Sequence, residues 1–194
     1  MISAVLAGTG TFIKSNVGTV TLSGANTLSG LMDITGGTLA ISGGGLLTSG
    51  SVTVSGGATV LGLGQSTQTV GGFRLGAGTV QNGTLNAASF GVESGLISAV
   101  LAGGATLTKS TVGTVTLSGA NTLGGLMDIK AGTLVISGGG LLTSGSVTVS
   151  GAATLLTLGT SAQSVGAFSL VDGTVADGSL TASSFGVANG LVSA

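Results

Sequence analysis

Residues 18–24 read Gly-Thr-Val-Thr-Leu-Ser-Gly, and this short stretch decides the fold. Between its two glycines the apolar side chains alternate with Thr and Ser, which is the pattern of a strand with one buried and one hydrated face. The same alternation returns as Ser-Val-Thr-Val-Ser at residues 51–55. Glycine suits the ends of such strands because it adopts positive φ angles that a side chain disfavours. The sequence therefore predicts short strands joined by glycine-rich corners.

The chain is built from one long repeat. Ile-Ser-Ala-Val-Leu-Ala-Gly at residues 2–8 returns at residues 97–103, and the offset, 97 − 2 = 95, holds without a gap to the last residue. The two repeats are 2–96 and 97–191, and residues 192–194 begin a third copy. A fixed period of this length indicates a solenoid or a string of domains. We expect residues 1–194 to form a single continuous solenoid, cut from a longer array.

Each repeat subdivides further at its glycines. The segments 19–37, 38–57, 58–78, 79–96 and 97–113 are each close to 19 residues long, which gives five rungs per repeat and about ten in the chain. The dipeptides that mark antiparallel hairpins are nearly absent, with Asn82-Gly83 and Asp172-Gly173 among the few candidates. No stretch of helical spacing is free of glycine. We predict an all-β parallel β-helix (β-solenoid) with essentially no α-helix, forming a rod about 50 Å long at about 4.8 Å per rung.

Composition excludes several classes of function. Four basic and five acidic side chains give a net charge of −1, so there is no basic surface to neutralise phosphates, and no nucleic-acid partner is expected. The chain has no His and no Cys, which removes the usual general base and the ordinary zinc or copper ligands. Gly, Ser or Thr interrupts every apolar run before it could span a bilayer. The first residues also lack the pattern of a secretory signal, so the chain is either cytoplasmic or an excerpt.

One segment resembles a known family. Residues 18–27, Gly-Thr-Val-Thr-Leu-Ser-Gly-Ala-Asn-Thr, are followed by Gly30 and by Gly-Gly-Thr-Leu at residues 36–39, and a second copy runs over 113–134. This pattern resembles the passenger-associated β-strand repeat of bacterial autotransporters. The resemblance implies a right-handed β-helix passenger that is exported by a separate C-terminal β-barrel. It also implies an extracellular or bacterial outer-membrane surface location.

The charged residues do not predict a catalytic, metal or cofactor site. Asp33 and Asp128 are equivalent in the two copies, so five rungs would separate them by about 24 Å. Asp172 and Asp177 occur only in the second copy, and we interpret them as solvated loop acids; an acid/base or Ca²⁺ site is the alternative. Lys14 and Lys109 also repeat, and we expect them on an exposed rung edge.

Six uncharged residues are predicted to have structural roles. Asn26 and Asn121 follow a glycine corner in equivalent rungs, where Asn tolerates a left-handed backbone and can hydrogen-bond the turn. Phe73 and Phe168, like Phe90 and Phe185, are paired by the repeat and are expected in the core. An exposed aromatic binding stripe is the alternative for these phenylalanines.

We therefore expect a non-catalytic structural solenoid that acts as a cell-surface spacer or adhesin. A self-assembling extracellular fibre is the first alternative, because an open solenoid end leaves unpaired strand edges with few charges. Ice binding by a Thr face is the second alternative, although Ala40 and Gln81 break the Thr pattern. The partners to consider are adjoining repeats of the same array, further copies joined end to end, and a surface or glycan. No cofactor is expected.

Overall fold

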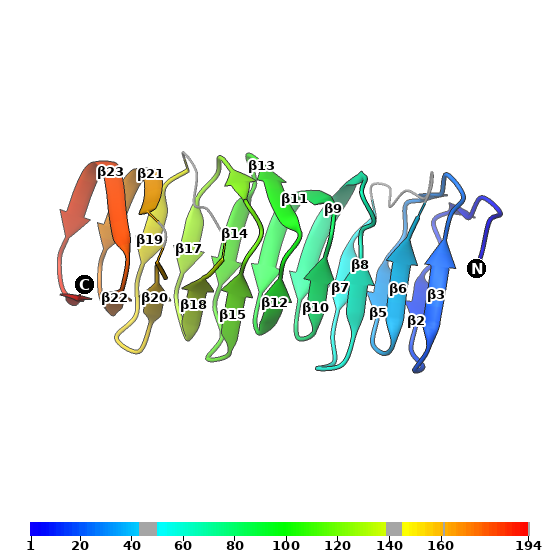
Figure 1. The fold of residues 1–194 in the computed structure, drawn as a ribbon, viewed down its shortest axis with the longest axis horizontal. Coiled ribbons are helices and arrows are strands. Elements are labelled where there is room, and N and C mark those ends of the chain that lie inside the picture. Colours follow the sequence, from blue (N-terminus) through cyan, green and yellow to red (C-terminus); the bar gives the residue numbers. More distant parts are fainter. Residues whose placement is uncertain (43–49, 139–144, 161, 194) are drawn as a thin grey trace.

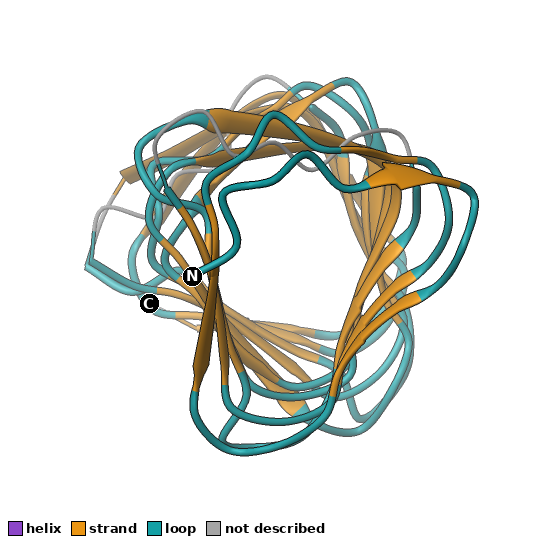
Figure 2. Cartoon of the chain, turned by 90° about the vertical axis from the view of Figure 1, so that its right-hand side faces the viewer, coloured by secondary structure: helices purple, strands orange, loops and turns teal. Residues whose placement is uncertain are grey.

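The computed structural model describes residues 1–42, 50–138, 145–160 and 162–193. Within these residues the regular structure is entirely β-strand, and every pairing between strands is parallel. The strands follow one another along a rod with the N-terminus at one end and the C-terminus at the other (Figure 1). Seen along the rod, the rungs superpose as one closed outline (Figure 2). The predicted parallel β-solenoid is thus confirmed, and no helix of the described residues could cross a membrane.

One side of the rod is a ten-stranded sheet that takes one strand from each rung. Its strands are β3 (Thr19–Leu22), β6 (Thr38–Ile41), β8 (Val60–Gly62), β10 (Thr79–Gln81), β12 (Gly95–Ile97), β15 (Thr114–Leu117), β18 (Thr133–Ile136), β20 (Leu155–Thr157), β22 (Thr174–Ala176) and β24 (Leu191–Ser193). About nine turns join them, with a spacing of about 19 residues.

The predicted start of the fifth rung is wrong by two residues. Strand β12 begins at Gly95, so the expected boundary before Ile97 falls inside it. The cause is a shorter turn, because Thr79 pairs with Leu96 after 17 residues whereas Thr38 pairs with Val60 after 22. A uniform rung length cannot reveal such differences.

The remaining strands form a twelve-stranded sheet and one separate pair. The larger sheet contains β2 (Phe12–Lys14), β5 (Met32–Ile34), β7 (Val52–Val54), β9 (Thr67–Leu75), β11 (Thr84–Val92), β13 (Val100–Gly103), β14 (Thr106–Lys109), β16 (Thr122–Leu123), β17 (Met127–Ile129), β19 (Val147–Val149), β21 (Ala162–Leu170) and β23 (Ser179–Val187); β1 (Ala7–Gly8) and β4 (Thr27–Leu28) form the pair. Strand β11 pairs with β13 through its first residues and with β14 through its last. Each nine-residue strand therefore fills the place of two short strands.

The corners use positive φ angles, as the glycine pattern predicts. At Asn82 and Gly83 the φ angles are 61° and 58°, and their equivalents Asp177 and Gly178 have 59° and 65°. The flanking strands β10 and β11 belong to different sheets, so this Asn-Gly pair makes a corner and not a hairpin. Asn26 and Asn121 do not have positive φ angles. The left-handed backbone expected of them occurs instead at Asn82 and Asp177.

Two inward ladders run along the twelve-stranded sheet. The phenylalanine ladder consists of Phe12, Met32, Val52, Phe73, Phe90, Leu107, Met127, Val147, Phe168 and Phe185. Phe73, Phe90 and Phe168 are buried as predicted, and the rings of Phe73 and Phe90 meet edge to face at 6.2 Å. The prediction is wrong for Phe185, which is 57% exposed because no further rung covers it in this chain.

Candidate functional site

The most informative polar residues are two buried lysines. Lys14 on β2 and Lys109 on β14 keep 6% and 0% of their surface exposed, so the prediction that they lie on an exposed rung edge is wrong. The reason is the alternation along the strand. On β2 the neighbouring Ile13 points outward and is 63% exposed, which turns Lys14 toward the core. Both lysines stand in a second inward ladder with Ile34, Val54, Leu75, Val92, Ile129, Val149, Leu170 and Val187, here termed the lysine ladder.

Each lysine ties two successive corners together. The Nζ atom of Lys109 donates to the carbonyl oxygen of Thr111 in its own corner and, at 3.1 Å, to that of Ala131 one rung later. Lys14 does the same with Asn16 and, at 2.8 Å, with Gly36. An ammonium group has three donors, which suits a corner where carbonyl groups converge. We call this arrangement the lysine clip.

Electrostatics at the second clip are set by burial. Loss of hydration lowers the pKa of Lys109 from its ordinary value of 10.5, because burial disfavours the charged form. Glu93 opposes this shift and raises the pKa, since a negative charge favours the ammonium ion. Glu93 follows Val92, which stacks on Lys109 in the lysine ladder. The ammonium charge of Lys109 is thus stabilised mainly by the carbonyl oxygens to which it donates.

Asn26 and Asn121 form a second kind of link between rungs. Both are 1% exposed, and their Oδ1 atoms accept hydrogen bonds of 2.9 Å from the main-chain N–H groups of Leu6 and Leu101. Those leucines lie 20 residues earlier, in the preceding rung. The main-chain N–H of Asn26 donates to the carbonyl oxygen of Gly24 at 2.9 Å, so the turn itself is closed by the backbone. The structural role predicted for these asparagines thus includes a bond to the neighbouring rung.

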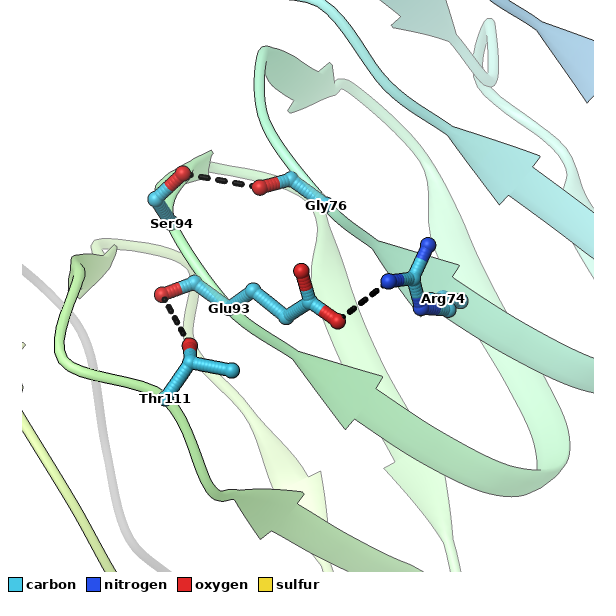
Figure 3. A network of polar contacts seen from close by, with 5 residues as sticks. All are labelled: Arg74, Gly76, Glu93, Ser94 and Thr111. Carbon is cyan, nitrogen blue, oxygen red and sulfur yellow. Dashed lines mark hydrogen bonds and ion pairs between the residues drawn. The ribbon is translucent and has the colours of Figure 1, made fainter.

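An exposed ion pair lies on the outer surface of the twelve-stranded sheet (Figure 3). The guanidinium group of Arg74 donates to the carboxylate of Glu93, and the Oγ1 of Thr111 donates to the Glu93 carbonyl oxygen at 3.3 Å. The Oγ of Ser94 donates to the carbonyl oxygen of Gly76 at 2.8 Å. Sequence reasoning missed Glu93, although its offset of 19 residues from Arg74 equals one rung. Exposed pairs of this kind contribute about 0–1 kcal/mol.

The acids singled out from the sequence are not gathered into one site. Asp33 and Asp128 face outward on β5 and β17, with four strands of the sheet between them. The carboxylate of Asp128 forms a salt bridge with Lys130, in which Oδ2 and Nζ lie 3.0 Å apart. Asp172 and Asp177 stand before and after β22, at different corners, and Asp172 accepts a hydrogen bond from the N–H of Gly173. Among the described residues, no three acidic side chains come together as metal ligands.

This geometry defines a class of protein: a parallel β-solenoid whose rungs are joined by inward ladders, buried lysine clips and asparagine bonds. Residues 12–41 and 107–136 match the family model described as passenger-associated-transport-repeat, so these two segments are similar to the repeat that the sequence pattern resembles. Each matched segment begins two residues before a clip lysine and contains the bonding asparagine. No curated protein and no solved structure is detectably similar to the chain.

Proposed function

We propose that the chain is a non-catalytic spacer, a rigid segment of an autotransporter-like passenger on the bacterial surface. The observation that carries this proposal is the continuity of the inward ladders from the first rung to the last. A rod without an interruption keeps whatever is attached to its two ends a fixed distance apart. The match to passenger-associated-transport repeats supports an extracellular or surface location. The absence of His and Cys from the sequence, together with the separation of the acids, supports a non-catalytic role.

Adhesion would need a surface that recognises something, and the outer ladders offer little for it. On the twelve-stranded sheet the outward residues change at almost every rung, from Asp33 to Thr53, Arg74 and Gly91. On the ten-stranded sheet Thr21 is followed by Ala40 and Gly62. A regular Thr lattice is therefore broken early, which argues against ice binding. A spacer needs no such regularity.

The test places the chain between an outer-membrane anchor and a fluorophore, and measures the distance of the fluorophore from a membrane dye by energy transfer. Ten rungs should add about 48 Å. A matched insert with only one 95-residue repeat should add about half of that. An unchanged distance would refute the spacer role. Saturable binding of the isolated chain to glycans or host-cell surfaces would assign adhesion instead.

A further inference from the structure

The corner between β10 and β11 consists of an asparagine followed by a glycine. Asn82 is exposed and Gly83 is half-buried, and together they make the whole connection between Gln81 and Thr84. Within the part of the chain that the structure describes, neither the side-chain amide of Asn82 nor the main-chain N–H of Gly83 has a hydrogen-bond partner. The amide carbon and the nitrogen that follows it in the chain are thus not held by other groups.

The corner also has room for a reaction with water. A surface cleft of about 620 Å³ lies beside it, lined by Gly64, Gln65, Asn82, Gly83, Thr84 and Val100. A Cβ atom on Gly83 would lie 2.7 Å from the carbonyl oxygen of Ser66, so the packing of successive corners requires glycine at this position. Because glycine has no side chain, its nitrogen is open to attack a neighbouring group. The residue that the fold requires is therefore also the one that leaves this nitrogen unshielded.

The other five asparagines of the sequence, all among the described residues, lack this combination. Asn26 and Asn121 are buried, and their Oδ1 atoms accept hydrogen bonds from the preceding rung. Asn16 is followed by a β-branched valine, and Asn86 lies inside β11 with strands paired on both sides of it. Asn189 also precedes a glycine, but its Nδ2 donates to a carboxylate oxygen at 3.3 Å. Asn82 is the one that joins an exposed, unpartnered amide to a following glycine.

We propose that Asn82 is a site of spontaneous deamidation, with water as the co-reactant. Hydroxide removes the proton from the Gly83 nitrogen, whose electron pair forms a bond to Cγ of Asn82. The bond between Cγ and Nδ2 breaks, and Nδ2 takes up a proton from water and leaves as ammonia, so that a five-membered succinimide ring remains. Water then opens the ring. Cleavage at Cγ gives aspartate, and cleavage at the main-chain carbonyl carbon gives isoaspartate, in which the main chain runs through the former side chain.

The second copy of the repeat shows that this corner accepts the aspartate product. Asp177 stands 95 positions after Asn82, and its φ angle of 59° differs little from the 61° of Asn82. Aspartate at residue 82 should therefore leave the corner unchanged, while the formal net charge becomes −1 − 1 = −2. Isoaspartate instead adds the Cβ atom to the main chain of a two-residue corner that joins strands of different sheets. This reaction goes beyond the spacer role, because it alters the rod as the protein ages.

The first test follows the reaction in the folded chain at neutral pH by tryptic digestion and tandem mass spectrometry. Cleavage after Arg74 and Lys109 places Asn82 and Asn86 in one peptide, so that each serves as a reference for the other. Asn82 should convert about tenfold faster than Asn86 or more, and should give both aspartate and isoaspartate. If Asn82 stays intact in the folded chain, the proposal is wrong, and conversion in urea alone would show that the corner protects it.

The second test uses two variants. Asp177→Asn places an asparagine before Gly178 in the equivalent corner and should create a second reactive site. Asn82→Asp carries the aspartate product and should unfold at the same temperature as the unsubstituted chain, whereas aged chains enriched in isoaspartate should unfold at a lower temperature, as measured by circular dichroism. Lack of reaction in Asp177→Asn would show that this corner does not permit deamidation. Aged chains as stable as Asn82→Asp would refute the strain expected of isoaspartate.

Discussion

At the scale of single residues, the clip lysines show how a charged side chain can be accommodated in an apolar core. Lys109 has no exposed surface, yet its stem fills the same ladder position as Val92 and Ile129. Its ammonium group ends at two main-chain carbonyl oxygens of successive corners. Corners are where a solenoid leaves carbonyl groups outside the ladders, and buried acceptors without a donor are costly. The lysine therefore combines apolar packing with hydrogen bonding.

Replacing this lysine tests the clip. Lys109→Met keeps an unbranched apolar side chain, one atom shorter than lysine, but removes the donors to Thr111 and Ala131, so we expect a loss of about 1–3 kcal/mol in the free energy of unfolding. Chemical denaturation at pH 7 measures it. The matched control is Lys130→Met, which removes an exposed pair with Asp128 and should change stability by less than about 1 kcal/mol. A more stable Lys109→Met chain would show that charge burial outweighs the two hydrogen bonds.

The same pair of chains predicts a pH dependence. Because burial lowers the pKa of Lys109 below 10.5, the folded chain binds fewer protons than the unfolded chain between the lowered pKa and 10.5. Stability then rises with pH across that window. The difference in unfolding free energy between the unsubstituted chain and Lys109→Met should therefore be larger at pH 10 than at pH 7. A difference that shrinks with pH would mean that the ammonium form is favoured in the folded state.

The clip could have been found in the sequence only by following side-chain parity. Alternation along residues 12–14 places Phe12 and Lys14 on the same face, but a charged residue is normally assigned to solvent, and that assumption produced the error. The pair of Arg74 and Glu93 could have been predicted only by comparing their separation of 19 residues with the length of one rung. The burial of Phe73 and Phe90 was predictable, because their large apolar side chains and their recurrence in the second copy both indicate a core position. Phe185 was not, since its exposure depends on its place in the rod and not on its type.

At the scale of elements, glycine corners decide where strands end. Gly132 precedes β18, has a φ of +70°, and a Cβ atom there would lie 2.3 Å from the carbonyl oxygen of Thr111. Both the backbone conformation and the close approach of the neighbouring rung require glycine. Strand alternation and such corners were readable from the sequence. The differing lengths of the turns were not, because they depend on how many residues each corner holds.

Substituting this glycine should shift two rungs against each other. Gly132→Ala should lower the free energy of unfolding by about 2 kcal/mol or more, from backbone strain and the clash together. The control is Gly104→Ala, where a Cβ atom meets nothing within 4 Å and φ is not in the positive range. Thermal unfolding followed by circular dichroism compares the two variants. Equal midpoints would contradict the close packing of successive corners.

At the scale of the whole molecule, the rod is a one-dimensional stack. Each rung contacts the rung before it and the rung after it, so stability is close to a sum over neighbouring pairs. An inner rung such as that of β12 has two neighbours, whereas the rung of β24 has one. The lysine clips and asparagine bonds follow the same rule, since each reaches only an adjacent rung. Local changes should therefore spread over short distances.

Amide hydrogen exchange measures how far the effect of a local change spreads along the rod. Amides of β11, β12 and β15 should exchange most slowly, and those of β1 and β24 most rapidly, because a terminal rung can open without breaking contacts on a second side. Gly132→Ala should speed exchange in β15 and β20 on either side of β18, and leave β3 and β6 unchanged. If all strands instead exchanged at one common rate in both chains, the rod would open only as a whole, and coupling would extend far beyond neighbouring rungs.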